Sequence, residues 1–355
     1  MRFVAASLVV LHHCWTLITV PGQADFGSTF EIGAIGVDIF FVISGFLMIF
    51  ITAQRKQGPV EFFVSRLLRV GPPYWVVTGA MVAMLIYAPR MFGSTRFNLA
   101  AVVTSLAFVP WPHPTDGGVN AVVEILPIMH FGWTLNYEMA FYSLFAVTLF
   151  VAPKYSCELS SVVILALVFL GLVGKSDHFA FEFYSSPIML EFVFGMIVGK
   201  FYVNGFTIPA KNAVLLFFLA AVVVASVSNI SITRTTPLRW LLWGVPSALM
   251  FFSVISLEKR GSIAASSTLR FLGDSSYSVY LTQLFTLGGF RLMWRSLRLS
   301  GNISDALMIG SAYVACIGVG MLFHIAVERP LVRGATSIRK KLFANRVSPN
   351  KSGSR

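Results

Sequence analysis

Long apolar stretches follow one another along nearly the whole chain. They occupy residues 3–20, 34–52, 72–90, 131–152, 160–174, 185–203, 211–229, 238–257, 274–295 and 306–327. A helix of about 20 residues crosses a hydrocarbon core of roughly 30 Å, so the pattern predicts an all-α polytopic membrane protein with about ten transmembrane helices. The interval 97–130 contains a shorter apolar piece, SLAFVPWP. Its prolines and its brevity favour a re-entrant or interfacial segment over a further crossing.

Composition and charge support this class and give the chain an orientation. The 355 residues are 56% hydrophobic and only 12% charged, which leaves no room for a soluble domain. With an even number of spans, most Lys and Arg residues fall on the side that holds the two ends of the chain, so both termini are expected to be cytoplasmic. The net charge of +12 is then explained by topology and by attraction to membrane lipid headgroups, not by nucleic acid. The basic segment 331–355 is expected to be a disordered cytoplasmic tail.

Polar side chains inside the first span are the first candidates for chemistry. Arg2 and His13 are 11 residues apart in a predicted helix, which puts them within about 20° of one face with a rise of roughly 16 Å. His12 points about 80° away from Arg2 by the same count. An arginine at the cytoplasmic mouth and a histidine deeper on the same face suit a pocket for an anion and a proton-transfer group. Alternatively, Arg2 only obeys the positive-inside rule and His13 is a hydrogen-bonded packing residue.

Two carboxylates also lie at membrane depth. Asp38, near the outer end of the second span, costs about 2.5–3.5 kcal/mol if unpaired, so it needs a partner or a wet cavity. Ser44 and Gly45 follow it and allow another helix or a ligand to approach closely. Glu138 lies in the fourth span with hydroxyls four residues away on either side, in Thr134 and Tyr142. An ionisable group there indicates a functional site, with a structural polar network as the alternative.

Two arginines, Arg66 and Arg69, precede the third span in the segment FFVSRLLRVGPPYW. Their spacing of three residues places them on one face of a helical turn, where two guanidinium groups form a donor site suited to phosphate. Topology or lipid headgroup contacts are the alternative explanation. The three cysteines lie in or beside apolar spans without metal-ligand spacing, so no metal site is expected. Tyr277 and Tyr280, at the start of the ninth span, fit residues of an interfacial belt.

The motifs taken in order resemble the membrane-bound acyltransferase 3 family over nearly the whole chain. They are Arg2 and His13 with ten residues between them, then GVDIFFVISGF, SRLLRVGPPYW, WTLNYEMAFY, GDSSYSVYL and a terminal ERP. The segments FVPWPHP and WTLNYE, without an appended soluble domain, are most similar to bacterial exopolysaccharide O-acyltransferases of the succinoglycan type. The resemblance implies a transmembrane acyltransferase domain over residues 1–330. It also implies a multi-pass protein of the bacterial inner membrane.

The resemblance further implies the activity and the site. An acyl group, with acetyl as our expectation, would pass from cytoplasmic acyl-CoA to a hydroxyl of a carbohydrate or lipid-linked saccharide, with no bound cofactor. His13 would be the catalytic histidine, and Arg2, Arg66 and Arg69 would bind the acyl-CoA. One departure is visible, because Gln283 stands where many relatives have a histidine after the SYSxYLx pattern.

The positions of the polar residues and the family resemblance together suggest a mechanism centred on His13, with two alternative roles for its imidazole. His13 acts either as a general base on the sugar hydroxyl or as a transiently acylated nucleophile, and Glu138 or Asp38 orients the imidazole or the acceptor. The rival function is a transporter or flippase that moves a lipid-linked sugar or a small anion without chemistry. No inverted repeat or matched pair of broken helices is evident in support of that rival.

Overall fold

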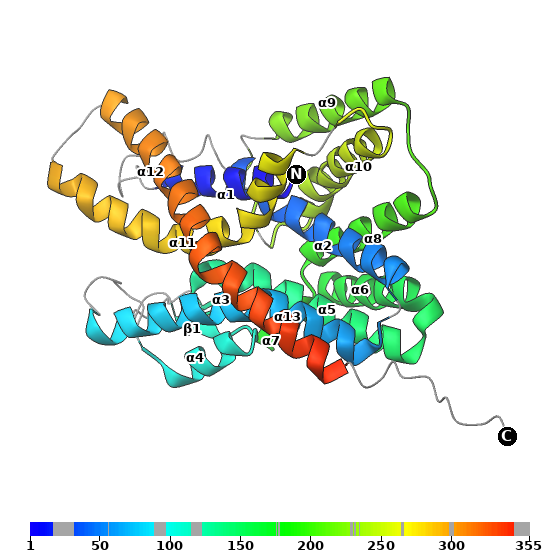
Figure 1. The fold of residues 1–355 in the computed structure, drawn as a ribbon, viewed down its shortest axis with the longest axis horizontal. Helices are drawn as coiled ribbons and strands as arrows, with labels where there is room; N and C mark the ends of the chain where they lie inside the picture. Colours follow the sequence, from blue (N-terminus) through cyan, green and yellow to red (C-terminus); the bar gives the residue numbers. More distant parts are fainter. Residues whose placement is uncertain are drawn as a thin grey trace.

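The computed structural model describes residues 1–16, 32–55, 57–88, 97–114, 123–174, 176, 178–227, 230, 232–233, 235–263, 266–297 and 302–343. Within them the fold is nearly all helical (Figure 1). The helices are α1 (Arg2–Thr16), α2 (Ile35–Gln54), α3 (Pro59–Tyr87), α4 (Leu99–Leu106), α5 (Trp133–Val151), α6 (Ser156–Val173), α7 (Phe179–Tyr184), α8 (Leu190–Val203), α9 (Ala210–Ser226), α10 (Val245–Lys259), α11 (Ser267–Leu297), α12 (Asn302–Phe323) and α13 (Arg329–Phe343). Short 3-10 turns are η3 (His130–Gly132), η4 (Pro153–Tyr155) and η5 (Pro187–Met189), and short π-helical turns are η6 (Trp240–Gly244) and η7 (His324–Glu328). Two three-residue strands, β1 (Pro112–Pro114) and β2 (Val123–Ile125), pair antiparallel.

Six helical stretches among the described residues are long and apolar enough to cross a membrane. They are Ile32–Gln54, Pro59–Tyr87, His130–Val151, Pro153–Val173, Trp240–Lys259 and Ser304–Phe343. The chain is therefore an all-α, multi-pass membrane protein, as the apolar pattern predicts. The count of about ten spans and the cytoplasmic side of both termini stay predictions. Helix α4, in the segment expected to be re-entrant, has 8 residues and at about 1.5 Å per residue is too short to cross.

The third span begins earlier than the sequence pattern predicted. Helix α3 starts at Pro59, and Pro72 and Pro73 lie inside it instead of opening it. Internal prolines remove backbone donors from the helix, and neighbouring helices in a membrane protein can satisfy the carbonyl groups left without a partner. Pro72 and Pro73 remove the i+4 donors to the carbonyls of Leu68 and Arg69. In the same turn, the hydroxyl of Tyr277 on α11 donates to the carbonyl of Val70, at 2.7 Å. The helical turn predicted for Arg66 and Arg69 is therefore part of a continuous helix that runs on through the two prolines.

Close packing of α2 against α8 fixes the centre of the molecule. A Cβ atom added at Gly45 would lie 2.1 Å from the carbonyl oxygen of Phe192, and one added at Gly195 would lie 2.0 Å from that of Val42. The prediction of a close helix approach at Gly45 is therefore confirmed. The largest apolar cluster joins side chains of α2, α3, α5, α8 and α11, and these helices carry most of the polar groups described below.

The end of the described chain differs from the disordered tail expected from residue 331. Helices α12 and α13 and the turn η7 between them form one nearly continuous rod across the molecule, and α13 packs on α3 (Figure 1). The reason is that α13 is amphipathic: Ala335 is buried and Val332 is half-buried, whereas Arg333 and Lys340 are exposed. A basic helix with an apolar face is typical of a membrane interface. Residues 344–355 of the expected tail lie outside the described residues.

Candidate active site

A cavity of about 90 Å³ lies between α1, α2, α3, α5 and α11; we call it the central cavity. Its polar lining is Arg2, Ser44, Arg66, Arg69, Thr134, Glu138, Tyr142, Tyr277 and Tyr280, and its apolar lining includes Val37, Phe40, Phe41 and Leu135. The structure thus brings together four side chains that the sequence singled out in three separate segments, namely Arg2, Arg66, Arg69 and Glu138. Tyr277 and Tyr280 are buried in this lining, at 8% and 6% exposure, and are not residues of an interfacial belt.

Positive charge dominates the central cavity. Three guanidinium groups and one carboxylate line it. Among the described residues, neither Arg2 nor Arg66 has a carboxylate within ion-pair distance, whereas Arg69 pairs with Glu328. Like charges in a site of low dielectric constant repel each other and favour an anion that can accept their hydrogen bonds. The central cavity is therefore suited to bind a negatively charged ligand.

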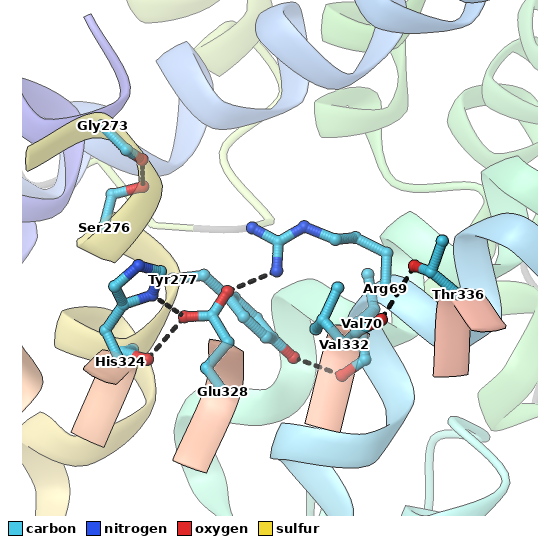
Figure 2. A network of polar contacts seen from close by, with 10 residues as sticks. Arg69, Val70, Gly273, Ser276, Tyr277, His324, Glu328, Val332 and Thr336 are labelled. Carbon is cyan, nitrogen blue, oxygen red and sulfur yellow. Dashed lines mark hydrogen bonds and ion pairs between the residues drawn. The ribbon is translucent and has the colours of Figure 1, made fainter. Parts of the chain in front are cut away.

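Arg69 is held by a buried network that the sequence did not reveal (Figure 2). Glu328, 1% exposed, accepts hydrogen bonds from Arg69 and from Ser278 Oγ at 2.6 Å, and it lies 2.8 Å from His324 Nδ1. Tyr277 lies beside the same guanidinium group, 5.9 Å from ring centre to Cζ. In the sequence, the ERP motif is the only signal for Glu328, because its contact with Arg69 joins residues 259 positions apart.

The two carboxylate oxygen atoms of Glu138 differ in their hydrogen bonds. Ser44 Oγ donates to Glu138 Oε1 at 2.8 Å, and the hydroxyl of Tyr142 donates to the same atom. No hydrogen bond joins Oε2 to any residue in the described part of the chain. The predicted pairing with Tyr142 is thus present, whereas Thr134 contacts the hydroxyl of Tyr280 instead, at 2.9 Å. The carboxylate is held in place by Oε1 and can accept a further proton or hydrogen bond at Oε2.

His13 lies beyond the central cavity and not in its lining. Its ring centre is 4.1 Å from that of Phe131, and Tyr280 donates its hydroxyl to the carbonyl of Phe131 at 2.6 Å. Of the two groups proposed for chemistry, Glu138 therefore lines the central cavity and His13 does not. Tyr280 and Thr134, which line the cavity, are bonded to each other at 2.9 Å. We call these two residues and Phe131, whose ring packs on the imidazole, the partition.

Gln283, the visible departure from the family pattern, is the hydrogen-bond partner of His13. The distance from His13 Nδ1 to Gln283 Oε1 is 3.1 Å, and Gln283 Nε2 donates to the carbonyl of Tyr280 at 3.0 Å. The second contact fixes the orientation of the amide, since only its nitrogen can donate to a carbonyl. The amide oxygen can only accept, so Nδ1 of His13 carries the proton. The lone pair of a neutral ring is then on Nε2.

Asp38 belongs to a different cluster. It is fully buried and receives two hydrogen bonds from Arg239, Nε to Oδ1 at 3.0 Å and Nη2 to Oδ2 at 2.6 Å. The guanidinium group also lies over the ring of Trp243, 4.8 Å from its centre. Glu191, equally buried, lies beside the pair. The expectation that Asp38 needs a partner is confirmed, and its place apart from the central cavity indicates that any effect on catalysis is indirect.

Comparison with known proteins agrees with this architecture. The model of the acyltransferase 3 family, described as an acyltransferase domain, matches residues 1–325. The chain is similar to the exopolysaccharide production protein ExoZ of Rhizobium meliloti, with 36% identity over 307 residues that cover 86% of this chain and 92% of the relative. It is also similar to nodulation protein 10 of Rhizobium leguminosarum bv. viciae, with 23% identity, 98% of this chain and 95% of the relative covered. No solved structure matches the chain. The chain belongs to the acyltransferase 3 family and is a multi-pass membrane acyltransferase.

Proposed function

We propose that this protein is an O-acyltransferase of the bacterial inner membrane that acylates a sugar hydroxyl of an exopolysaccharide or of its lipid-linked precursor. The donor is cytoplasmic acyl-CoA, with acetyl as the expected acyl group. The central cavity carries the proposal, because it combines three guanidinium groups for the phosphates of CoA with a carboxylate that has an available oxygen atom. The similarity to ExoZ, an exopolysaccharide production protein, supports the class of acceptor.

The arginines and His13 then have separate tasks. Arg2, Arg66 and Arg69 hold the phosphates of CoA, and the thioester end of its pantetheine arm extends towards His13. Arg2 and His13 lie in one helix, α1, with a rise of roughly 16 Å between them, comparable to an extended pantetheine arm. The thioester passes the partition at Tyr280 and Thr134 to reach the imidazole. Glu138 lies on the donor side, where Oε2 orients the thioester arm or shuttles a proton.

The chemical step balances with His13 as the base. The sugar oxygen forms a bond to the acyl carbon, the carbon–sulfur bond breaks, and Nε2 of His13 accepts the proton of the hydroxyl and returns it to the CoA thiolate. Gln283 keeps the proton on Nδ1, so that the lone pair of the neutral ring is on Nε2. In the relayed variant, Nε2 carries the acyl group before the sugar attacks. Label that stays on the protein when the acceptor is omitted distinguishes the relayed from the direct route.

The test uses membranes that contain the protein, labelled acetyl-CoA and a pool of lipid-linked saccharide. The native chain is compared with His13→Ala and, as a matched control from the same helix, His12→Ala. We expect labelled saccharide with the native chain and the control and at least a hundredfold less with His13→Ala, the scale of general-base catalysis. Absence of CoA-dependent label with the native chain, or full activity of His13→Ala, overturns the proposal. Uptake of an unmodified saccharide would instead favour a transporter.

A further inference from the structure

A second cavity, of about 110 Å³, lies between α3 and α13; we call it the side cavity. The residues of interest in its lining are Ser65, Arg66, Arg69, Val332, Thr336 and Arg339. Arg66 and Arg69 line the central cavity as well. The same turn of α3 therefore separates the two cavities and can present its guanidinium groups to both.

Positive charge in the side cavity is not compensated. Its lining holds three arginines and no carboxylate. Glu328 neutralises Arg69, but in the described part of the chain neither Arg66 nor Arg339 has an ion-pair partner. Arg339 is close enough to Arg66 for the two charges to repel each other. Two facing cations are unfavourable in a partly buried site unless an anion lies between them.

Arg339 is more buried than the other basic residues of α13. The basic residues Arg333, Lys340 and Lys341 are exposed, whereas Arg339 is half-buried. Val332, Thr336 and Arg339, at positions i, i+4 and i+7, share the face that packs on α3; in Figure 2, Val332 and Thr336 lie beside Arg69. The hydroxyl of Thr336 donates to the carbonyl of Val332 at 2.8 Å, so the guanidinium groups are the donors available to a ligand. An arginine on the packed face of an amphipathic helix is costly without such a ligand.

We propose that the side cavity binds the 3′-phosphate of CoA and that Arg339 makes the enzyme selective for donors that carry this phosphomonoester. The inference rests on the proposed use of acyl-CoA. The 3′-phosphate and the pyrophosphate of CoA are attached to the same ribose, so a pyrophosphate at Arg66 and Arg69 places the 3′-phosphate within reach of Arg339. The thioester arm then enters the central cavity on the other side of the same turn. The phosphate of a lipid headgroup has similar chemistry and is the competing occupant.

The experiment measures initial rates with acetyl-CoA and with 3′-dephospho-acetyl-CoA. It compares the native chain, Arg339→Gln and, as a control on the exposed face, Lys340→Gln. We expect the native chain and the control to prefer acetyl-CoA about tenfold in kcat/KM, the size of one charge-assisted hydrogen bond. Arg339→Gln should raise the KM for acetyl-CoA about tenfold, keep kcat, and leave the KM for the dephospho donor unchanged. Native protein should also be inhibited more strongly by adenosine 3′,5′-bisphosphate than by adenosine 5′-phosphate, which tests the site without a variant.

Each contrary result has a distinct meaning. Equal use of both donors by the native chain, with equal inhibition by the two nucleotides, overturns the 3′-phosphate site and leaves the acyltransferase function intact. A loss in Arg339→Gln that is equal for both donors also overturns it. If that loss in addition depends on phosphatidylglycerol in the vesicles, the occupant is a lipid headgroup. No transfer from either donor by the native chain refutes the proposed function itself.

Discussion

Substitutions in the cluster of Asp38, Glu191 and Arg239 test whether Asp38 stabilises the fold or takes part in catalysis. The cluster contains two buried carboxylates and one guanidinium group, with side-chain exposures of 0% for Asp38 and 4% for Arg239. Neither carboxylate oxygen of Glu191 has a hydrogen-bond partner among the described residues. Arg239→Gln leaves two buried carboxylates without a cation. Asp38→Asn leaves Glu191 as the remaining carboxyl group beside Arg239, and Glu191→Gln keeps the Asp38–Arg239 ion pair.

The magnitudes follow from these charge balances. Removing one partner of a buried ion pair costs about 3–5 kcal/mol, so Arg239→Gln should lower the midpoint of thermal unfolding by about 5–15 °C. Asp38→Asn should cost about 1–3 kcal/mol, the penalty for an imperfectly satisfied buried group. Glu191→Gln should leave the midpoint within about 2 °C, because it keeps the Asp38–Arg239 ion pair at little change in side-chain shape.

The assay heats detergent-solubilised protein and measures the monodisperse fraction by size-exclusion chromatography. Acyl transfer is measured on unheated membranes and divided by the amount of folded chain. We expect all three variants to keep at least half of the native activity per folded molecule. If Asp38→Asn keeps the native midpoint but loses a hundredfold in activity, Asp38 takes part in the chemistry and our reasoning from its position is refuted.

Three further predictions concern the site. Glu138→Gln should lower kcat by about a hundredfold, the scale of acid–base catalysis, at an unchanged thermal midpoint; an unchanged kcat in the transfer assay excludes proton transfer by this carboxylate. Gln283→Leu should lower kcat about 10- to 100-fold, because His13 loses a hydrogen-bond acceptor worth about 1.5–3 kcal/mol when its ring is charged. Gln283→Glu keeps an acceptor and should retain activity. Equal rates for the two variants would contradict this role of Gln283. Glu328→Gln should raise the KM for the donor about tenfold and lower the free energy of unfolding by about 1–3 kcal/mol, because Arg69 loses its charged partner. A KM equal to that of the native chain would show that Arg69 is positioned without Glu328.

The length of the apolar stretches was sufficient to predict an all-α membrane protein, because membrane helices satisfy their own backbone and need only an apolar surface. It failed at the start of α3, where Pro72 and Pro73 resemble a helix start but lie inside a helix that packs against α5 and α13. The prediction for α13 was also wrong, because a basic helix with one narrow apolar face has the composition of a disordered tail. Both errors concern segments whose structure depends on a distant partner.

The sequence identified the polar residues of the site, but it did not show which of them lie together in space. The sequence identified Glu138 as a polar position at membrane depth and Arg66 and Arg69 as a pair on one helical face before the third span, and the structure places all three around one cavity. Spacing within one helix could not show that Asp38 faces Arg239, which is 201 positions away. It also could not show that Gln283 faces His13, at a separation of 270 positions. Such pairings are set by tertiary packing, which periodicity does not contain.

One helix connects the two parts of the proposed mechanism. On α11, Tyr277 supports the α3 carbonyl next to Arg69, Tyr280 closes the partition, and Gln283 orients His13. The backbone carbonyl of Tyr280 also holds the amide of Gln283, so one residue contributes its side chain to the partition and its backbone to the contact that orients the imidazole. In the proposed reaction only the acyl end of the donor has to pass this point, while the phosphates stay at the arginines. A transporter would have to move its whole substrate past the same hydrogen-bonded tyrosine, and this difference is the structural reason to favour chemistry over transport.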